Sequence, residues 1–293
     1  MSGRQVIATP CKVNLHLGIH REKDARGYHR VDSVMVPVAL FDTVCVEDAP
    51  TLEVHHEPAL EVPPEKTTVW RAVKLLAEEL GREPSVRVSV EARIPEKAGL
   101  GGSSADAGAT LRALAERWDV AAGDPRVVGV ARRVGADVAF FLNPVPSLCL
   151  GAGDVLERTF PSFEVPLVLV MPSAEGVSTR EAYDEFDRIG EEPRGYEAAC
   201  AALETGDVSG MAAHLYNNLA PAACSLCGEV GAAAGWLAGQ PGVLASQVTG
   251  SGACSFALCE SEAAADAIAA RARAEHGWRA WSIKTVGLPE KVC

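Results

Sequence analysis

The chain has 293 residues, of which 48% are hydrophobic and 23% charged, and its formal net charge is −12. This length predicts two domains of ordinary size. The acidic excess argues against a broad nucleic-acid-binding surface, so an anionic ligand requires a local site of amides or basic groups. We find no apolar run of signal-peptide or membrane-span length, and we expect a cytoplasmic protein that binds neither nucleic acid nor membrane.

Nine cysteines are spread along the chain without a repeating spacing, which is typical of reduced thiols rather than a disulfide framework. Cys224 and Cys227 form the one CxxC pair. With no second such pair and no nearby pair of histidines, we interpret them as two thiols on a helix rather than as zinc ligands. The sequence carries no signal for the oligomeric state.

The N-terminal part of the chain is predicted to begin with two strands. Residues 6–20 alternate between apolar and polar side chains and predict a half-buried strand, with Lys12 and Asn14 on its polar face. A polar loop leads to a second extended region at residues 31–46. Apolar residues at helical spacing then predict a helix that is capped by Thr67 or Thr68.

The middle of the chain reads as strand, glycine-rich loop and helix. Residues 86–90 alternate as a strand, and residues 107–118 place apolar side chains at intervals of three and four. A further helix at residues 125–134 precedes Gly135-Ala136-Asp137 and the apolar run 138–142.

The C-terminal part is predicted to contain one strand, at residues 167–171, followed by helices. The expected helices lie near residues 179–186, 198–203, 211–215, 229–237 and 261–276. We place a domain boundary near residues 155–165, which divides the chain into domains at 1–160 and 161–293.

The glycine-rich loop carries the strongest functional signal. Several close glycines let backbone amides point at one anion, and the helix that follows adds its own unpaired amides and the positive end of its dipole. The two hydroxyls at the helix entrance suit a phosphate oxygen or a phosphate-bound Mg²⁺ ion. The loop has neither P-loop nor dinucleotide-fold spacing. The predicted phosphate-binding residues are Pro95, Gly99, Leu100, Gly101, Gly102, Ser103 and Ser104.

This loop resembles the second motif of the GHMP kinases, the superfamily of galactokinase and of homoserine, mevalonate and phosphomevalonate kinases. Pro10-Cys11-Lys12-Val13-Asn14-Leu15 is similar to its first motif, and residues 248–254 are similar to its third, another glycine-rich loop. The three stretches follow the family's order and span most of the chain. The resemblance implies a two-domain α+β fold, with an N-terminal domain like that of small-ribosomal-subunit proteins and a ferredoxin-like C-terminal domain.

Further stretches resemble one branch of this superfamily, the diphosphocytidyl-methylerythritol kinases. Gly27-Tyr28-His29 is similar to that branch's GYH, and residues 135–141 to its GADVPFF. Residues 177–183 are similar to its VSTxxAY, and residues 217–221 to its N-D-L-E-P. The resemblance therefore implies ATP-dependent phosphorylation of the 2-hydroxyl of a cytidylated tetritol, with ATP and Mg²⁺ as cofactors.

The resemblance also implies roles for individual residues. Asp137 receives the proton of the substrate hydroxyl, and Lys12 holds that carboxylate and stabilises charge on the transferring group, which is what phosphoryl transfer requires. Tyr28 and Tyr183 correspond to aromatic residues set against cytosine, and His29 to a residue that bonds its edge. The full set of implied substrate-binding residues is Asn14, Tyr28, His29, Tyr183, Thr249, Gly250 and Ser251.

Three positions depart from the branch's pattern. Ser103 replaces the third glycine of the loop at unchanged length, and Thr67 replaces an asparagine that helps to hold the nucleotide. Cys11 replaces an alanine, and we interpret it as packing rather than as a nucleophile.

Two alternative functions stay open. One is another GHMP kinase, acting on homoserine or mevalonate, and the other is a silent GHMP-fold protein that binds a nucleotide or metabolite.

Overall fold

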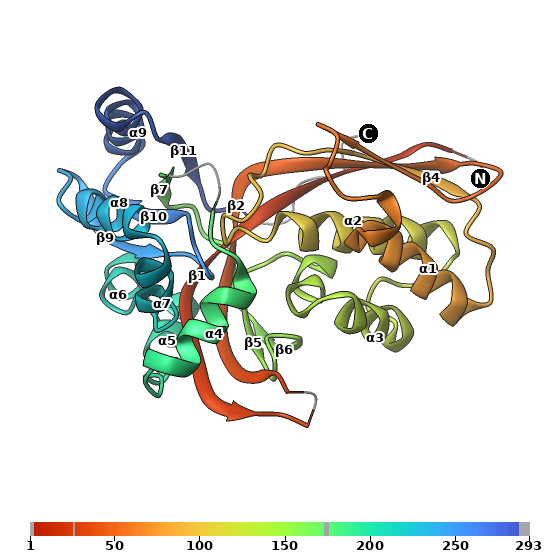
Figure 1. Cartoon of the computed structure of the whole chain (residues 1–293), viewed down its shortest axis with the longest axis horizontal. Helices are drawn as coiled ribbons and strands as arrows, with labels where there is room; N and C mark the ends of the chain where they lie inside the picture. Colours follow the sequence, from red (N-terminus) through yellow and green to blue (C-terminus); the bar gives the residue numbers. More distant parts are fainter. Residues whose placement is uncertain (1–2, 26, 173–175, 287–293) are drawn as a thin grey trace.

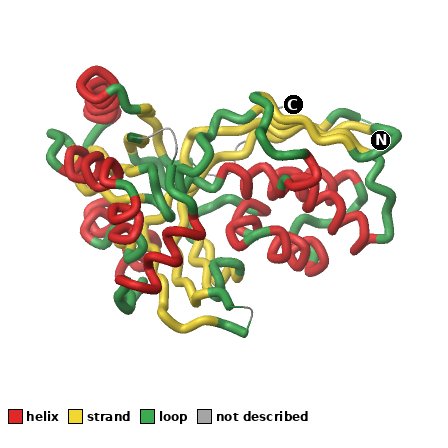
Figure 2. Tube along the Cα trace, viewed as in Figure 1, coloured by secondary structure: helices red, strands yellow, loops and turns green. Residues whose placement is uncertain are grey.

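The computed structural model describes residues 3–25, 27–172 and 176–286. Two β-sheets form the frame of the molecule, and helices cover their outer faces (Figures 1 and 2). The long strands β1 and β2 run from one half of the molecule into the other (Figure 1). The predicted α+β class is confirmed.

The first sheet is built around the antiparallel pair β1 and β2. Its order is β3-β4-β2-β1-β8, with β5 paired to β2 and β6 to β5. The strand β3 runs parallel to β4, and the short β8 runs parallel to β1. The bounds are β1 (Gln5–Lys23), β2 (His29–Asp48), β3 (Glu53–Glu57), β4 (Val86–Glu91), β5 (Ser147–Leu150), β6 (Val155–Thr159) and β8 (Tyr216–Asn217).

Three helices cover one face of this sheet: α1 (Thr68–Leu80), α2 (Gly102–Arg117) and α3 (Pro125–Val134). Thr67 begins α1 as predicted, because its hydroxyl accepts the backbone N–H of Trp70 at 3.1 Å. Short 3₁₀ turns flank these helices at η1 (Pro64–Lys66), η2 (Ala136–Val138) and η3 (Phe140–Leu142).

The second sheet has the order β11-β7-β10-β9, and its neighbouring strands are all antiparallel. Its strands are β7 (Pro166–Met171), β9 (Val243–Val248), β10 (Ser255–Cys259) and β11 (Arg279–Lys284). The helices of this half are α4 (Thr179–Ile189), α5 (Glu197–Thr205), α6 (Val208–Ala213), α7 (Ala220–Leu226), α8 (Gly228–Ala238) and α9 (Glu262–His276).

One apolar core joins the two sheets. Val13 of β1 and Val36 of β2 are fully buried in the same cluster as Leu169 of β7 and Phe256 of β10. Burial of such side chains contributes roughly 1.5–3 kcal/mol each. This shared core fixes the two halves against each other, and so fixes the walls of the space between them.

Two sequence-based expectations about strands were wrong. The first strand is not half-buried, because elements of the C-terminal half cover its polar face and leave Lys12 and Asn14 only 3% and 2% exposed. The strands β9, β10 and β11 fall in a region where only helices were expected. All five residues of β10 are buried, so it shows no alternation of apolar and polar residues that would reveal a strand.

The sheets divide near the predicted domain boundary, which we retain as a proposal. The strand β6 belongs to the first sheet, and β7 begins the second. The halves nevertheless interlock, because β8 of the C-terminal part returns to pair with β1. Among the described helices, none combines the length and apolar character needed to cross a membrane.

Candidate active site

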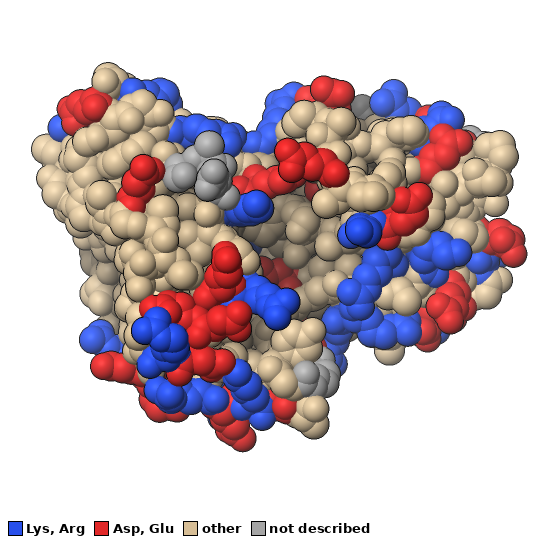
Figure 3. Space-filling model, viewed as in Figure 1, with Lys and Arg blue, Asp and Glu red and all other residues tan. Residues whose placement is uncertain are grey.

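A cavity of about 920 Å³ opens between the two halves. Its walls come from β1, the glycine-rich loop, the turn η2, the start of α4 and the loop that follows β9. The space-filling view shows this hollow at the centre of the molecule (Figure 3). Residues from all three GHMP-like motifs therefore meet around one space.

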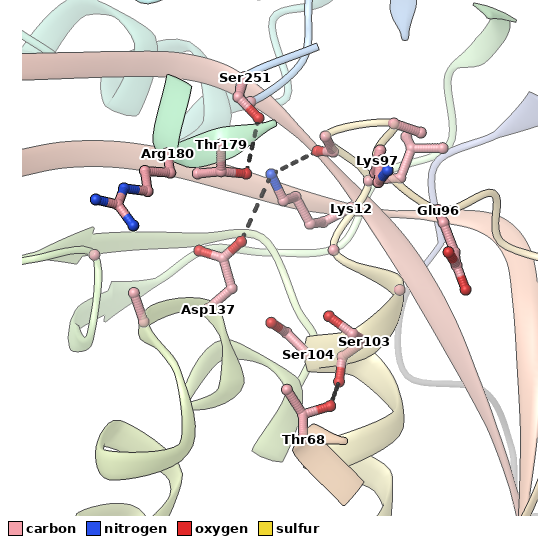
Figure 4. Close-up of a pocket in the computed structure, with 18 of the residues that line it drawn as sticks. Lys12, Thr68, Glu96, Lys97, Ser103, Ser104, Asp137, Thr179, Arg180 and Ser251 are labelled. Atoms are coloured by element: carbon pink, nitrogen blue, oxygen red, sulfur yellow. Dashed lines mark hydrogen bonds and ion pairs between the residues drawn. The ribbon is translucent and has the colours of Figure 1, made fainter. Parts of the chain in front are cut away.

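Lys12 projects from β1 into this cavity with its ammonium held in place. Its Nζ donates to Asn14 Oδ1 at 2.7 Å and to the backbone oxygen of Gly99 at 2.8 Å, and it lies 3.8 Å from Asp137 Oδ2 (Figure 4). Burial lowers the pKa of Lys12 from its ordinary value, and the Asp137 carboxylate partly opposes this effect. The three oxygen neighbours favour the charged form of the amine.

Asp137 reaches the same point from the turn η2, 125 positions later in the sequence. The side chain of Asp137 is 35% exposed, so its carboxylate faces the cavity while its Oδ2 contacts Lys12. The structure thus brings together two side chains that the sequence analysis paired through their motifs alone. One carboxylate oxygen remains directed at the open space where a substrate hydroxyl can bind (Figure 4).

The glycine-rich loop begins α2 in a backbone shape that only glycine adopts readily. Gly99 and Gly101 have φ angles of 73° and 76°, in the left-handed region. A Cβ on Gly99 would meet the backbone oxygen of Thr249 at only 2.0 Å. The loop therefore packs against the third motif and directs the amino end of α2 into the cavity, as a phosphate site requires.

Asn14 ties the first motif to the third. Its Oδ1 accepts the backbone N–H of Gly250 at 3.0 Å and the hydroxyl of Thr249 at 3.2 Å, in addition to the ammonium of Lys12. Its Nδ2 donates to Ser33 Oγ at 2.9 Å. Asn14 thus fixes Lys12 and two glycine-rich loops relative to one another.

Aromatic residues line the other arm of the cavity. Tyr28 is 59% exposed, and the rings of His29 and Tyr183 lie 5.5 Å apart. His29 Nδ1 lies 2.7 Å from the backbone oxygen of His20, which orients the ring. Its Nε2 lies 3.1 Å from Asp187 Oδ1 but forms a hydrogen bond with none of the described residues. This arm of the cavity thus presents aromatic faces and one buried polar nitrogen.

The structure places nearly all predicted site residues on the cavity wall. These are Lys12, Asn14, Tyr28, His29, Pro95, Gly99, Leu100, Gly101, Gly102, Ser103, Ser104, Asp137, Tyr183, Gly250 and Ser251. Thr249 lies behind the wall and is fully buried, so we propose that it positions Asn14 and the loops.

Two of the three departures from the family pattern, Thr67 and Cys11, have structural explanations. The Thr67 hydroxyl donates to the backbone oxygen of Pro64 at 2.7 Å while it caps α1, so its proton is already committed. Cys11 is fully buried, and burial raises the pKa of its thiol well above the ordinary value, as expected of an inert packing residue. Cys224 lies within α7, and Cys227 is the residue between α7 and α8, so the two thiols span a helix junction instead of lying on one helix as expected.

Thr179, Arg180 and Asp187 are among the polar residues of the cavity that the sequence analysis did not identify, whereas it did predict Ser251. Thr179 and Ser251 place their hydroxyl oxygens 3.1 Å apart, and Arg180 follows on α4 (Figure 4). Asp187 lies one helical turn beyond Tyr183 and contacts both His29 and Lys23. Helical spacing from Tyr183 was the available signal for Asp187, because residues four apart share a helix face.

A buried pair of carboxyl groups, Asp42 and Asp106, lies beside the glycine-rich loop. Asp42 accepts the backbone N–H groups of Arg93 and Ile94 at 2.5 and 2.8 Å, and its side chain is hydrogen-bonded to Asp106. Asp106 is 6% exposed, and burial together with the charge of Asp42 raises its pKa well above the ordinary value. Because two backbone N–H groups favour the charged form of Asp42, we expect Asp106 to hold the proton of the pair and to link the first turns of α2 to β2.

We expect the free energy of unfolding of Asp106→Asn, measured relative to that of the native chain, to increase as the pH is raised. The folded state holds a proton on Asp106 that the unfolded state releases near pH 4, so the stability this proton contributes is lost as pH climbs toward the raised pKa. An amide donates a similar hydrogen bond without binding that proton. Urea unfolding at pH 5.5 and 8.5 should show the difference growing by roughly 1–3 kcal/mol.

The exposed Asp266 on α9 provides the matched control, because Asp266→Asn changes one charge without touching the pair. Equal effects of Asp106→Asn at both pH values would contradict a protonated Asp106.

Comparison with known proteins agrees with this geometry. The sequence pattern described as "GHMP kinases N terminal domain" matches residues 67–143, and "GHMP kinases C terminal" matches residues 199–277. Both regions contribute to the fold around the cavity.

The chain belongs to the GHMP kinase family.

Relatives within the GHMP kinases share one name. The 4-diphosphocytidyl-2-C-methyl-D-erythritol kinase of Rhodococcus jostii (strain RHA1) is 37% identical over 274 residues, covering 88% of this chain and 85% of that protein. The protein of the same name from Nocardia farcinica (strain IFM 10152) is 38% identical over 278 residues, covering 90% of this chain and 88% of its own length.

Solved structures of GHMP kinases share the fold. A crystal structure of 4-(cytidine 5'-diphospho)-2C-methyl-D-erythritol kinase matches with a TM-score of 0.77 and 29% identity, covering 97% of this chain and 100% of that one. The homoserine kinase of Cytophaga hutchinsonii matches with a TM-score of 0.69 and 19% identity, covering 98% and 96%. The predicted family and two-domain GHMP fold are thereby confirmed.

Proposed function

We propose that this GHMP kinase transfers the γ-phosphate of ATP to the 2-hydroxyl of 4-diphosphocytidyl-2-C-methyl-D-erythritol. One observation carries the proposal. Lys12, Asp137 and the glycine-rich loop lie together in the same cavity as the aromatic residues Tyr28 and Tyr183. Two relatives more than 35% identical over most of the chain carry the name of this activity.

In the proposed reaction the 2-hydroxyl oxygen attacks the γ-phosphorus, the bond to the β-phosphate oxygen breaks, and ADP leaves. Asp137 receives the hydroxyl proton. Lys12 stabilises the charge that spreads over the oxygens of the transferring group, in a buried setting where such stabilisation is strong. The amides of the loop at Gly99–Gly102 and the amino end of α2 hold the remaining phosphates.

Cytosine is proposed to occupy the aromatic arm. Tyr183 and the exposed Tyr28 offer ring faces to a flat base, and the buried Nε2 of His29 offers one hydrogen-bonding atom. The arm adjoins Asp137, so a base bound there keeps the far end of an extended substrate beside the catalytic carboxylate.

We also propose that a magnesium ion accompanies ATP. The described residues include no group of three or more His, Cys, Asp or Glu side chains arranged around a metal. Mg²⁺ at kinase sites is commonly bound through phosphates, water and few protein groups. The hydroxyls of Ser103 and Ser104 at the start of α2 fit that role, and the ion supplies charge neutralisation on the phosphates.

An ATP-consumption assay with a panel of alcohols tests this function. We expect turnover with the cytidylated tetritol and none with homoserine or mevalonate, because neither of those alcohols fills the aromatic arm. Turnover with homoserine or mevalonate instead would assign another GHMP activity. ATP binding without turnover of any alcohol would indicate a silent nucleotide-binding protein.

A further inference from the structure

A second, smaller hollow of about 100 Å³ adjoins the main cavity, and three arginines line it. They are Arg71 of α1 and Arg132 and Arg133 of α3. We propose that this arginine site, Arg71 with Arg132 and Arg133, binds the diphosphate group of the acceptor substrate. The inference rests on the proposed function, and it adds the groups that recognise the anionic middle of that substrate.

The position of the arginine site matches the middle of the substrate. The small hollow and the main cavity share the walls Tyr28, Ala136 and Ala152. Tyr28 belongs to the proposed base-binding arm, and Ala136 directly precedes Asp137. A diphosphate that joins cytidine to the tetritol must pass between those two anchors, along the walls the hollows share.

The main cavity has few basic side chains that are available to bind a diphosphate. Six carboxyl side chains and five Lys or Arg side chains line the main cavity, and Lys12 is already committed to the reacting end. In a chain of net charge −12, binding two phosphorylated substrates side by side requires additional local cations. The arginine site provides three, against one carboxylate, Asp154, in the same lining.

Arg132 is held in a defined orientation. Its Nε donates to Asp154 Oδ2 at 2.9 Å, and Asp154 is a buried carboxylate that also accepts the backbone N–H of Ala152 at 3.0 Å. This contact leaves both terminal nitrogens of Arg132 without a hydrogen bond to any described residue. A guanidinium oriented in this way binds two phosphate oxygens at little entropic cost.

Arg71 adds an uncommitted charge. It is exposed on α1 and forms no ion pair within the described part of the chain, whereas Arg133 pairs with Glu79 at 2.9 Å. In the space-filling view, basic side chains gather on the side of the main cavity that is formed near α3, while acidic side chains are more frequent on the opposite side (Figure 3). The anion is therefore attracted to one wall of the cleft.

Calorimetry with CDP and with cytidine tests the site, with saturating ADP present to occupy the donor position. The two ligands share the base and the ribose, and only CDP carries a diphosphate. The affinity for CDP divided by the affinity for cytidine therefore measures recognition of the diphosphate. We expect Arg132→Gln to reduce the CDP-to-cytidine ratio about tenfold, because a charge-assisted hydrogen bond to phosphate is lost. Raising the KCl concentration should weaken CDP binding less in this variant than in the native chain.

Two further variants keep the test decisive. Arg71→Gln alters an exposed side chain that forms no ion pair with the described residues, so this variant should fold normally and should also lower the ratio. It therefore tests the site even if loss of the Asp154 contact unfolds Arg132→Gln. Arg126→Gln, on the same helix but outside the hollow, should leave the ratio unchanged. A native ratio in Arg71→Gln and in folded Arg132→Gln would overturn the arginine site alone. Failure of the native chain to bind either ligand would overturn the proposed function, and this inference with it.

Discussion

Replacing Asp137 with asparagine is expected to reduce kcat by roughly 10²- to 10⁴-fold, the usual contribution of a positioned general base. Asparagine has the same shape and can keep a contact with Lys12, but it cannot accept the proton of the attacking hydroxyl. The affinity for the acceptor should therefore change little, since the aromatic arm and the arginine site do not depend on the charge of Asp137.

Steady-state kinetics together with calorimetry of acceptor binding separates these effects for Asp137→Asn. Asp266→Asn, a change of the same kind on the exposed face of α9, should retain native kcat. A native kcat in Asp137→Asn would show that another group takes the proton. A loss confined to acceptor affinity would show that Asp137 binds substrate without reacting.

Replacing Lys12 with methionine is expected to lower kcat by roughly 10²- to 10³-fold, the cost of removing one donor aimed at developing charge. Methionine fills the buried space left by the lysine chain, so the loss should come mainly from the missing ammonium. The loop and Asn14 lose one shared partner, but their bonds to Thr249 and Gly250 remain.

The pH dependence of kcat/KM gives a second measure of Lys12. The ammonium is the active form, and burial lowers its pKa, so native activity should decline at alkaline pH through an apparent pKa below the ordinary lysine value of 10.5. That alkaline decline should disappear from the residual activity of Lys12→Met. Lys74→Met, on the exposed face of α1, should keep both the native rate and the native profile. An unchanged alkaline decline in Lys12→Met would assign it to another group.

The sequence-based predictions succeeded where the signal is local. Thr67 caps α1 as expected, because a hydroxyl before a helix bonds an amide only three residues away. The glycines before α2 were equally readable, because left-handed backbone at Gly99 and Gly101 selects glycine directly.

The same approach failed for elements that depend on distant partners. The strand β10 lies between β7 and β9 with every side chain buried, so its sequence lacks the alternation of a half-exposed strand. The polar side of β1 was expected to face solvent, but the C-terminal half covers it. Burial of this kind depends on the packing of segments more than 200 residues apart, such as Asn14 and Gly250.

The sequence by itself determined the family and the identities of the proposed catalytic pair, because both follow from short motifs whose residues are adjacent in the chain. Only the tertiary structure decided that Lys12 reaches Asp137, that Asp42 pairs with Asp106, and that arginines from α1 and α3 share one hollow. The physical reason is that distances between side chains on separate elements are set by how the two sheets pack around their common core, and that packing leaves no short-range pattern in the sequence.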